Sequence, residues 1–331
     1  MIYIENDELI IQFPELHPNA GVTIDFQRTL RLPDDGKTYP LPPGLGSFPL
    51  RHIEDYDLGH QNAIKKRGGI IMPMFQADAL WLNFNSIIQD AAALEYPLAI
   101  KIGAGKVCAI SGEQWCSQLN QHPQDYLVVP EQPWLDGFNV ADGTIRQFVA
   151  DPLGNRATVE EQITGTSEIG GIQIEIYPMK KSYFDSLHKV SSTQIELNNK
   201  LIFNLEMGLS AGGKMHQEIY DDPYDFSAWD LRNSQRVFIT LANAEQWMTV
   251  TGEEPPLKSI TAEEYNKAGL PWFDYYDRDK AAIEGAKALG KIKSFQAVYL
   301  EKGQSNWSEE TISGEPTVLS TMKRMVKMGN W

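Results

Sequence analysis

The amino-acid sequence predicts an α+β protein that is mainly β, an antiparallel sandwich or barrel with a mixed α/β C-terminal part. The first half contains many short apolar runs separated by glycine, proline and aspartate, a spacing typical of such sheets. Beyond residue 260, stretches rich in alanine, lysine and glutamate favour helices. We expect a β-rich domain over residues 1–180 and a mixed α+β domain over residues 181–331, which could also form one continuous unit.

The first clear strand signal spans residues 22–32. Val22, Ile24 and Phe26 alternate with polar residues, which indicates a strand with one mostly buried face. The proline- and glycine-rich stretch that follows, up to residue 50, cannot be helical and predicts an ordered, turn-rich loop. Such a loop is a candidate surface for function.

Further β-like runs predict the rest of the sheet. They cover residues 68–75, 97–110, 125–130, 144–150, 157–165, 170–178, 214–220 and 236–242. The run over 97–110 predicts a hairpin that turns at Gly103, Ala104 and Gly105.

Helical signals appear in the C-terminal part. Thr261 and Glu264 form a capping-box pattern, and residues 277–292 have a helical composition. Residues 317–328 predict a basic amphipathic helix with a methionine-rich apolar face. Because the chain as a whole is acidic, this helix could dock on an acidic, apolar groove of a second copy, and we expect a homo-oligomer.

Composition excludes several classes of protein. A net charge of −15 disfavours binding to nucleic acid, and no run approaches the roughly 18 apolar residues needed to span a membrane. The N-terminus lacks the pattern of a secretory signal. Cys108 and Cys116 lack metal-site spacing and fit a reducing compartment. We expect a soluble cytoplasmic protein.

The common catalytic and cofactor signatures do not occur. The chain contains no GxSxG or HExxH motif and no GxGxxG motif between a strand and a helix, and the glycines near Lys106 do not complete a phosphate loop. We therefore expect neither a bound cofactor nor a metal ion, and we favour a non-catalytic protein.

One segment nevertheless concentrates acid/base chemistry. If residues 214–220 form a strand, His216 and Glu218 fall on one face with Cα atoms about 7 Å apart, within reach of one metal ion or one substrate. With Asp221 they define a possible carboxylate- or metal-dependent hydrolase, in which Glu218 is the general base. The alternative is that the aspartates from Asp221 onward form turns, with Asp225 as a cap.

Two tryptophans next to carboxylates suggest a carbohydrate-binding module. An exposed Trp134 beside Asp136 could stack on a sugar or contact a partner protein, and Trp272 lies in a similar aromatic, acidic segment. The alternative is that both indoles fold back over the core.

Several long strings resemble an uncharacterised bacterial protein family of unknown function. They are RTLRLPDDGKTYPLPPGLG, PQDYLVVPEQPWLDG and GGKMHQEIYDDPYDFSAWD, and the resemblance runs from about Val22 to about Leu289. The resemblance implies no activity or ligand. Its pattern has arginine at the position of His216 and glycine near Arg156, which implies that His216 is not an obligatory metal ligand.

The sequence therefore favours a β-rich, non-catalytic binding or assembly protein and leaves its ligand unknown; a protein or a glycan could be its partner. Its loops of proline, glycine and aromatic residues suit shaped surfaces, whereas spacing alone assembles no nucleophile and base.

Overall fold

A large, mostly antiparallel sheet dominates the computed structural model, which describes residues 1–58, 63–89, 94–166, 168–187, 207–254, 261–274, 280–304 and 318–320. The strands of this sheet are β1 (Ile2–Glu5), β2 (Glu8–Gln12), β3 (Gly21–Thr29), β4 (Thr38–Tyr39), β5 (Gly44–Ser47), β6 (Arg51–His52), β7 (Ile70–Pro73), β8 (Ala79–Ser86), β9 (Leu98–Ala104), β10 (Val107–Cys108), β11 (Leu127–Val129), β12 (Trp134–Leu135), β13 (Gly137–Ala141), β14 (Thr144–Pro152), β15 (Ile172–Pro178), β16 (Met207–His216) and β17 (Gln235–Ala242). The predicted fold class, mainly β with a C-terminal α/β part, is confirmed.

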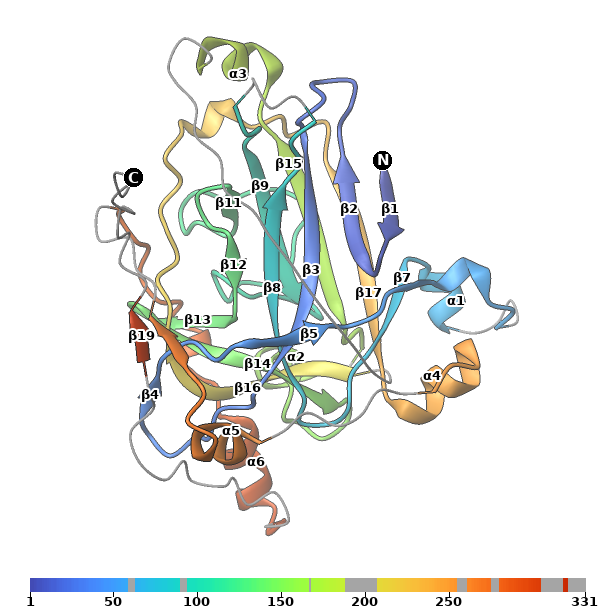
Figure 1. Cartoon of the computed structure of the whole chain (residues 1–331), viewed down its shortest axis with the longest axis vertical. Coiled ribbons are helices and arrows are strands. Elements are labelled where there is room, and N and C mark those ends of the chain that lie inside the picture. Colours follow the sequence, from blue (N-terminus) through green and yellow to red (C-terminus); the bar gives the residue numbers. More distant parts are fainter. Residues whose placement is uncertain are drawn as a thin grey trace, which may run out of the picture.

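Antiparallel ladders connect the long strands in the order β1, β2, β3, β8, β14, β16, β17, β15, β9 and β11. In parallel pairs, β4 joins β16 and β7 joins β17. The sheet is not closed. In Figure 1, β3, β8, β9 and β15 run roughly upright, and β14 and β16 cross below them. Strands from both sides of residue 180 belong to this sheet, because β14 pairs with β16 and β15 pairs with β17.

The main core lies between the strands of this folded sheet. Phe26 of β3, Leu82 of β8, Ile102 of β9, Ile174 of β15 and Ile239 of β17 belong to one buried cluster. Each is at most 1% exposed, so burial of these apolar side chains stabilises the strand order directly.

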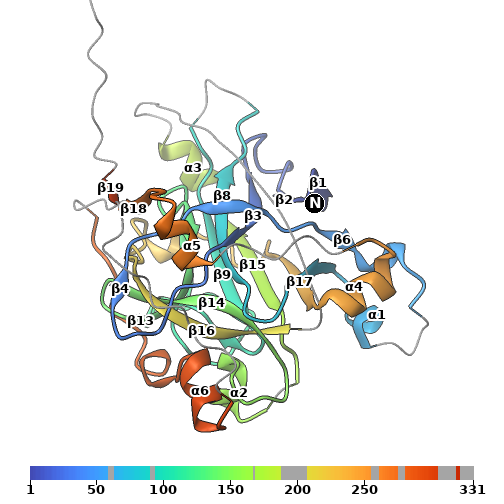
Figure 2. The same cartoon turned by 60° about the horizontal axis from the view of Figure 1, so that its bottom comes forward.

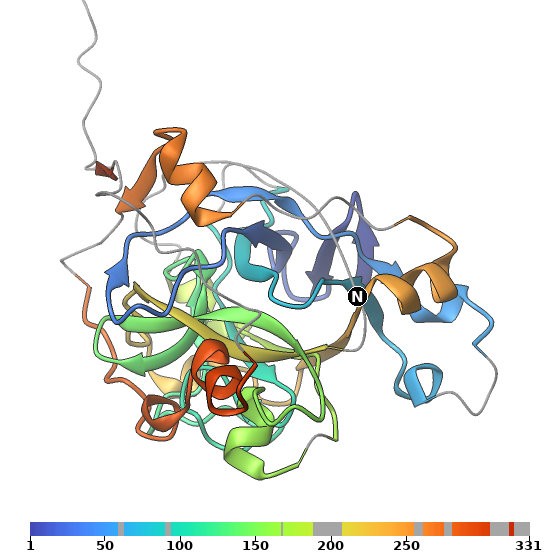
Figure 3. The same ribbon diagram turned by 90° about the horizontal axis from the view of Figure 1, so that it is seen from below.

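Short helices lie around the sheet. They are α1 (Ala63–Arg67), α2 (Val159–Thr164), α3 (Lys181–Leu187), α4 (Ala244–Thr251), α5 (Ala262–Lys267) and α6 (Phe295–Glu301). Figures 2 and 3 show α2 and α6 together near β16, and both contact that strand. At the other end of the molecule, Ile64 of α1 and Trp247 of α4 share a small apolar cluster with Ile71 of β7. This cluster fixes α1 next to the start of β7.

Several predicted local structures are confirmed. The hairpin predicted within 97–110 forms, but it turns at Gly105 and Lys106, because Gly103 and Ala104 belong to β9 and pair with Cys108 and Val107. Thr261 and Glu264 complete a capping box at α5. Asp225 caps a 3₁₀ turn, Phe226–Ala228, by accepting a hydrogen bond from the Ser227 N–H at 2.8 Å.

Residues 157–165 were expected to form a strand, and this prediction is wrong. They contain α2, because Thr158 and Glu161 form a capping box and Gly165 ends the helix in the left-handed conformation. Only the 3₁₀ turn Leu289–Lys291 forms within the described part of the predicted helix at 277–292, whose first three residues lie outside the described ranges. There the backbone pairs with the sheet instead, since Ala286 N–H donates to Asn139 O and Ile283 N–H donates to Ile219 O.

The predicted helix at 317–328 is contradicted where the structure describes it. Val318–Ser320 is a strand, β19, which pairs in parallel with β18 (Trp272–Asp274). Residue 317 and residues 321–328 lie outside the described residues, and self-association through this segment stays a prediction. Among the described residues, no helix is long and apolar enough to cross a membrane.

Candidate functional site

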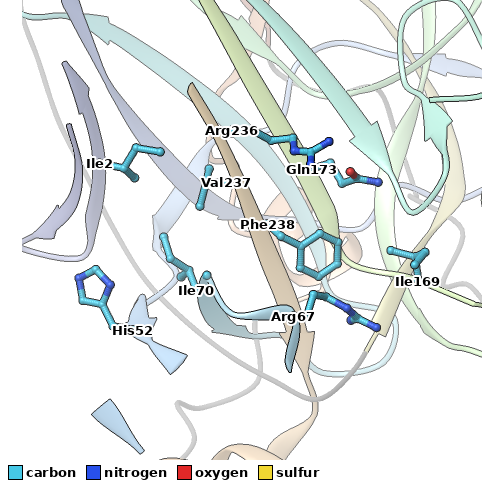
Figure 4. Close-up of a pocket in the computed structure, with 10 residues that line it drawn as sticks. Ile2, His52, Arg67, Ile70, Ile169, Gln173, Arg236, Val237 and Phe238 are labelled. Carbon is cyan, nitrogen blue, oxygen red and sulfur yellow. The ribbon is translucent and has the colours of Figure 1, made fainter. Parts of the chain in front are cut away.

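A pocket of about 550 Å³ opens beside the first half of β17 (Figure 4). Its walls come from β1, β6, β7, β15, β17 and the end of α1. The lining residues are Ile2, His52, Arg67, Gly69, Ile70, Ile169, Gln173, Arg236, Val237 and Phe238. Three of these can carry positive charge and none carries a carboxylate, although the chain as a whole has a net charge of −15.

The alternation of side chains along β17 decides which of its residues project toward each face of the sheet. Arg236 and Phe238 project from one face of β17, whereas Val237 projects from the opposite face into the main core. Gln173 of β15 lies directly across the ladder from Phe238. The pocket therefore combines cationic and polar side chains with apolar surface from Ile2, Ile169 and the Phe238 ring.

Arg67 reaches the pocket because the chain turns sharply after α1. Gly68 and Gly69 have φ values of 67° and 86°, in the left-handed region that glycine tolerates best. A side chain at Gly69 would place its Cβ 2.4 Å from the Phe238 carbonyl oxygen, so only glycine allows this close approach to β17. The guanidinium carbon of Arg67 lies 4.8 Å from the centre of the Phe238 ring, a cation–π contact.

Arg236 approaches the pocket from the strand itself and is exposed. Its Nη1 donates to the Ser117 hydroxyl at 2.8 Å, which anchors one edge of the guanidinium group. Within the described part of the chain, neither Arg67 nor Arg236 forms an ion pair. Figure 4 shows the two guanidinium groups on the same side, with Phe238 between them. Both guanidinium groups line the pocket.

The predicted acid/base residues lie elsewhere, around the turn at Gly143. A Cβ built on Gly143 would lie 3.4 Å from His216 Cε1 and 3.7 Å from Glu218 Cγ, so these two side chains share one surface. β16 ends at His216, and Glu218 therefore follows the strand instead of belonging to it. Both side chains lie near Gly143, but the strand expected over 214–220 ends at His216, so they do not share a strand face, and their catalytic role stays a prediction.

Asp221 lines a different cleft of about 780 Å³, whose lining includes Glu113, His122 and Glu284 but neither His216 nor Glu218. Asp222 also lines this cleft, and its carboxylate accepts hydrogen bonds from the Tyr126 hydroxyl at 2.6 Å and the Trp229 indole at 2.7 Å. The Asp222 side chain thus ties the turn to the core.

A metal site is not formed by the residues that the structure describes. Among them, no three His, Cys, Asp or Glu side chains come close enough to hold a metal ion.

The predicted sugar-binding residues are covered to different degrees. Trp272 is fully buried and packs edge-on against Tyr265, with ring centres 6.0 Å apart, so its ring offers no platform to a ligand. Trp134 in β12 is half-buried, and its role in binding stays a prediction. Asp136 is 4% exposed and accepts a hydrogen bond from Gln217 Nε2 at 2.8 Å. Burial raises the pKa of Asp136 to about 7, and hydrogen bonds from Trp134 and Gln217 oppose this shift.

Sequence reasoning missed the pocket beside β17 altogether. Arg67 and Arg236 are distant in the chain, and neither belongs to a recognisable motif. The pair Gly68 and Gly69 was the one local signal, because adjacent glycines before an apolar run indicate a close backbone approach.

Comparison of the chain with protein-family models, with curated proteins and with solved structures finds no match. The chemistry of the pocket is therefore the basis for a functional assignment.

Proposed function

We propose that this chain is a non-catalytic binding protein whose pocket beside β17 takes an anionic ligand with an apolar part. The observation that carries the proposal is that Arg67 and Arg236 both line a pocket whose ten lining residues include no carboxylate. Positive charge in a partly enclosed, low-dielectric cleft attracts anions far more strongly than isolated surface charges do. The acidic character of the rest of the chain directs anions toward this place.

The lining also argues for binding rather than covalent catalysis. Ser, Thr and Cys side chains, the usual nucleophiles, are missing from its lining residues. Ile2, Ile169 and the Phe238 ring, which line the pocket and are half-buried, instead provide apolar surface, which suits the body of a ligand whose anionic group reaches the two arginines.

Isothermal titration calorimetry of the full chain with acetate, benzoate, glutarate and inorganic phosphate tests this proposal. We expect measurable binding that weakens with added salt, because the contact is electrostatic. The double variant Arg67→Gln/Arg236→Gln should lose about tenfold or more in affinity, the order expected when two charged hydrogen bonds are lost.

Arg232→Gln provides the matched control, because Arg232 is an exposed arginine that lines a different pocket. This variant changes the net charge by one unit and should bind as the unchanged protein does. If the double variant binds all four anions as tightly as the control, the pocket is not the binding site.

A further inference from the structure

Two guanidinium groups of the pocket beside β17 lie on the same side of the strand with one aromatic ring between them (Figure 4). The guanidinium carbon of Arg67 lies over this ring, 4.8 Å from the centre of Phe238. Arg236 projects from the same face of β17 as Phe238, and its Nη1 donates to the Ser117 hydroxyl at 2.8 Å. Each guanidinium group is therefore held by a contact of its own.

This arrangement keeps the two positive charges apart. A single carboxylate binds two guanidinium groups at once only if they lie side by side, because the bonded nitrogen and oxygen atoms are about 2.7–2.9 Å apart. In the pocket the Phe238 ring occupies the place between the two groups (Figure 4). One carboxylate can pair with Arg67 or with Arg236, and a ligand that uses both arginines must carry two.

The strand sets the spacing between the two charges. Residues two positions apart on one face of a strand are separated by about 6.6 Å, at about 3.3 Å per residue. Arg236 belongs to β17 and Arg67 is held on the ring of Phe238, so the two charges are anchored about this far apart. Five carbon–carbon bonds of about 1.5 Å in a zigzag chain place two carboxyl carbons about 6 Å apart. A chain of about four methylene groups therefore fits.

Uncharged side chains line the rest of this side of the pocket. Ile169 and the ring of Phe238 are half-buried and offer apolar surface to a methylene chain. Gln173, across the ladder from Phe238, donates from Nε2 to a backbone carbonyl at 2.6 Å, which fixes its amide. Glu175, across the ladder from Arg236, is 4% exposed and does not belong to the lining.

We propose that the pocket beside β17 binds an aliphatic dicarboxylate of about six carbon atoms, with one carboxylate on Arg67, the other on Arg236, and the methylene chain along the edge of the Phe238 ring. This inference rests on the proposed anion-binding function and specifies its ligand. Two linked contacts bind more tightly than either alone, because the second one forms within the complex.

Calorimetric titration of the full chain with adipate and with monomethyl adipate tests the inference. The two ligands share a carbon chain and differ by one negative charge. We expect adipate to bind about tenfold or more tightly, the order expected for one additional charged hydrogen bond. Malonate, whose carboxyl carbons lie about 2.5 Å apart, cannot reach both arginines and should bind about as weakly as monomethyl adipate.

Single variants distinguish two contacts from one. Arg67→Gln and Arg236→Gln should each lower the affinity for adipate about tenfold, because either substitution leaves one contact. The affinity for monomethyl adipate should change at most about twofold, since the other arginine still binds its carboxylate. Arg67→Lys and Arg236→Lys keep the charge and should retain most of the preference for adipate. Arg232→Gln, in a different pocket, is the matched control and should bind adipate as the unchanged protein does.

Chemical modification of arginine gives a readout independent of affinity. Phenylglyoxal reacts with accessible guanidinium groups, and peptide mass spectrometry locates the modified residues. Saturating adipate should slow the modification of both Arg67 and Arg236 and leave that of Arg232 unchanged. Protection of only one of the two arginines would overturn the inference.

The possible outcomes separate the two proposals. If adipate and monomethyl adipate bind equally tightly, binding of a dicarboxylate by both arginines is wrong and anion binding stands. If no anion binds, both proposals fail. A preference for adipate that is unchanged in Arg67→Gln or in Arg236→Gln would place the second carboxylate elsewhere and would also overturn the inference.

Discussion

The guanidinium carbon of Arg67 lies 4.8 Å from the centre of the Phe238 ring, across the sharp turn that joins α1 to β7. A double-mutant cycle with Arg67→Ala and Phe238→Leu should give a coupling of about 0.5–1 kcal/mol, the usual size of a partly exposed cation–π contact. Chemical denaturation of the four proteins measures this coupling. The same cycle with Arg236→Ala, on the same face of β17, provides the control and should give less than about 0.3 kcal/mol. Equal coupling energies in the two cycles would show that the contact between Arg67 and Phe238 adds no stabilisation of its own.

Gly69→Ala should destabilise the protein much more than Gly36→Ala. The two glycines have nearly the same φ, 86° and 85°, so each substitution carries a similar conformational cost of about 1–2 kcal/mol. At Gly36 nothing lies within 4 Å of the new Cβ, whereas at Gly69 the Phe238 carbonyl oxygen lies 2.4 Å away. We expect a total cost above about 3 kcal/mol at Gly69, because the backbone of β7 and β17 must separate. Comparable unfolding midpoints for the two variants would contradict this close approach.

Asp136→Asn should make the protein less sensitive to pH between about pH 4 and pH 7. Burial raises the pKa of this carboxyl from its ordinary value to about 7, so in this range the folded state binds more protons than the unfolded state. Stability is then fully present below the unfolded pKa and is lost as pH rises, with a slope of at most about 1.4 kcal/mol per pH unit. Unfolding of both proteins across this range measures the difference in slope.

Asp225→Asn provides a control of opposite sign, because hydrogen bonds from the Ser227 side chain and backbone lower the pKa of Asp225. Its contribution is present above the unfolded pKa and is lost as pH falls. If Asp136→Asn and the unchanged protein have parallel profiles from pH 4 to pH 7, the raised pKa is wrong.

Lys101→Met alone should be more damaging than Lys101→Met combined with Asp125→Asn. Lys101 is 1% exposed, and its Nζ lies 2.5 Å from an Asp125 carboxylate oxygen. Removing the ammonium group leaves a buried negative charge without its partner, which costs about 3–5 kcal/mol. The second substitution removes that charge and should recover a substantial part of the loss. Calorimetric unfolding of the single and double variants tests this order, which would be reversed if the pair were solvated.

Local patterns were predicted well because their causes are local. The hairpin within residues 97–110 and the capping box of Thr261 and Glu264 depend on residues a few positions apart. The helix expected at 277–292 failed because the Ala286 amide bonds to Asn139 of β13, and pairing with a distant strand outweighed helix propensity.

The candidate pocket likewise depends on contacts between residues that are distant in the sequence. Arg67 meets Phe238 only after β7 pairs in parallel with β17, and no spacing in the sequence encodes that pairing. His216 and Glu218 are only two positions apart, so their common place near Gly143 needs no such long-range pairing.

The crossed pairing of β14 with β16 and β15 with β17 has a consequence for the integrity of the chain. A break in the peptide backbone anywhere between Pro178 and Met207 would leave β14 and β15 on a different fragment from β16 and β17, which pair with one side of each. Each fragment would then present long, unsatisfied strand edges that fit only the other fragment. A proteolytically nicked molecule should therefore remain one particle in solution, and two separately expressed pieces should reassemble when mixed.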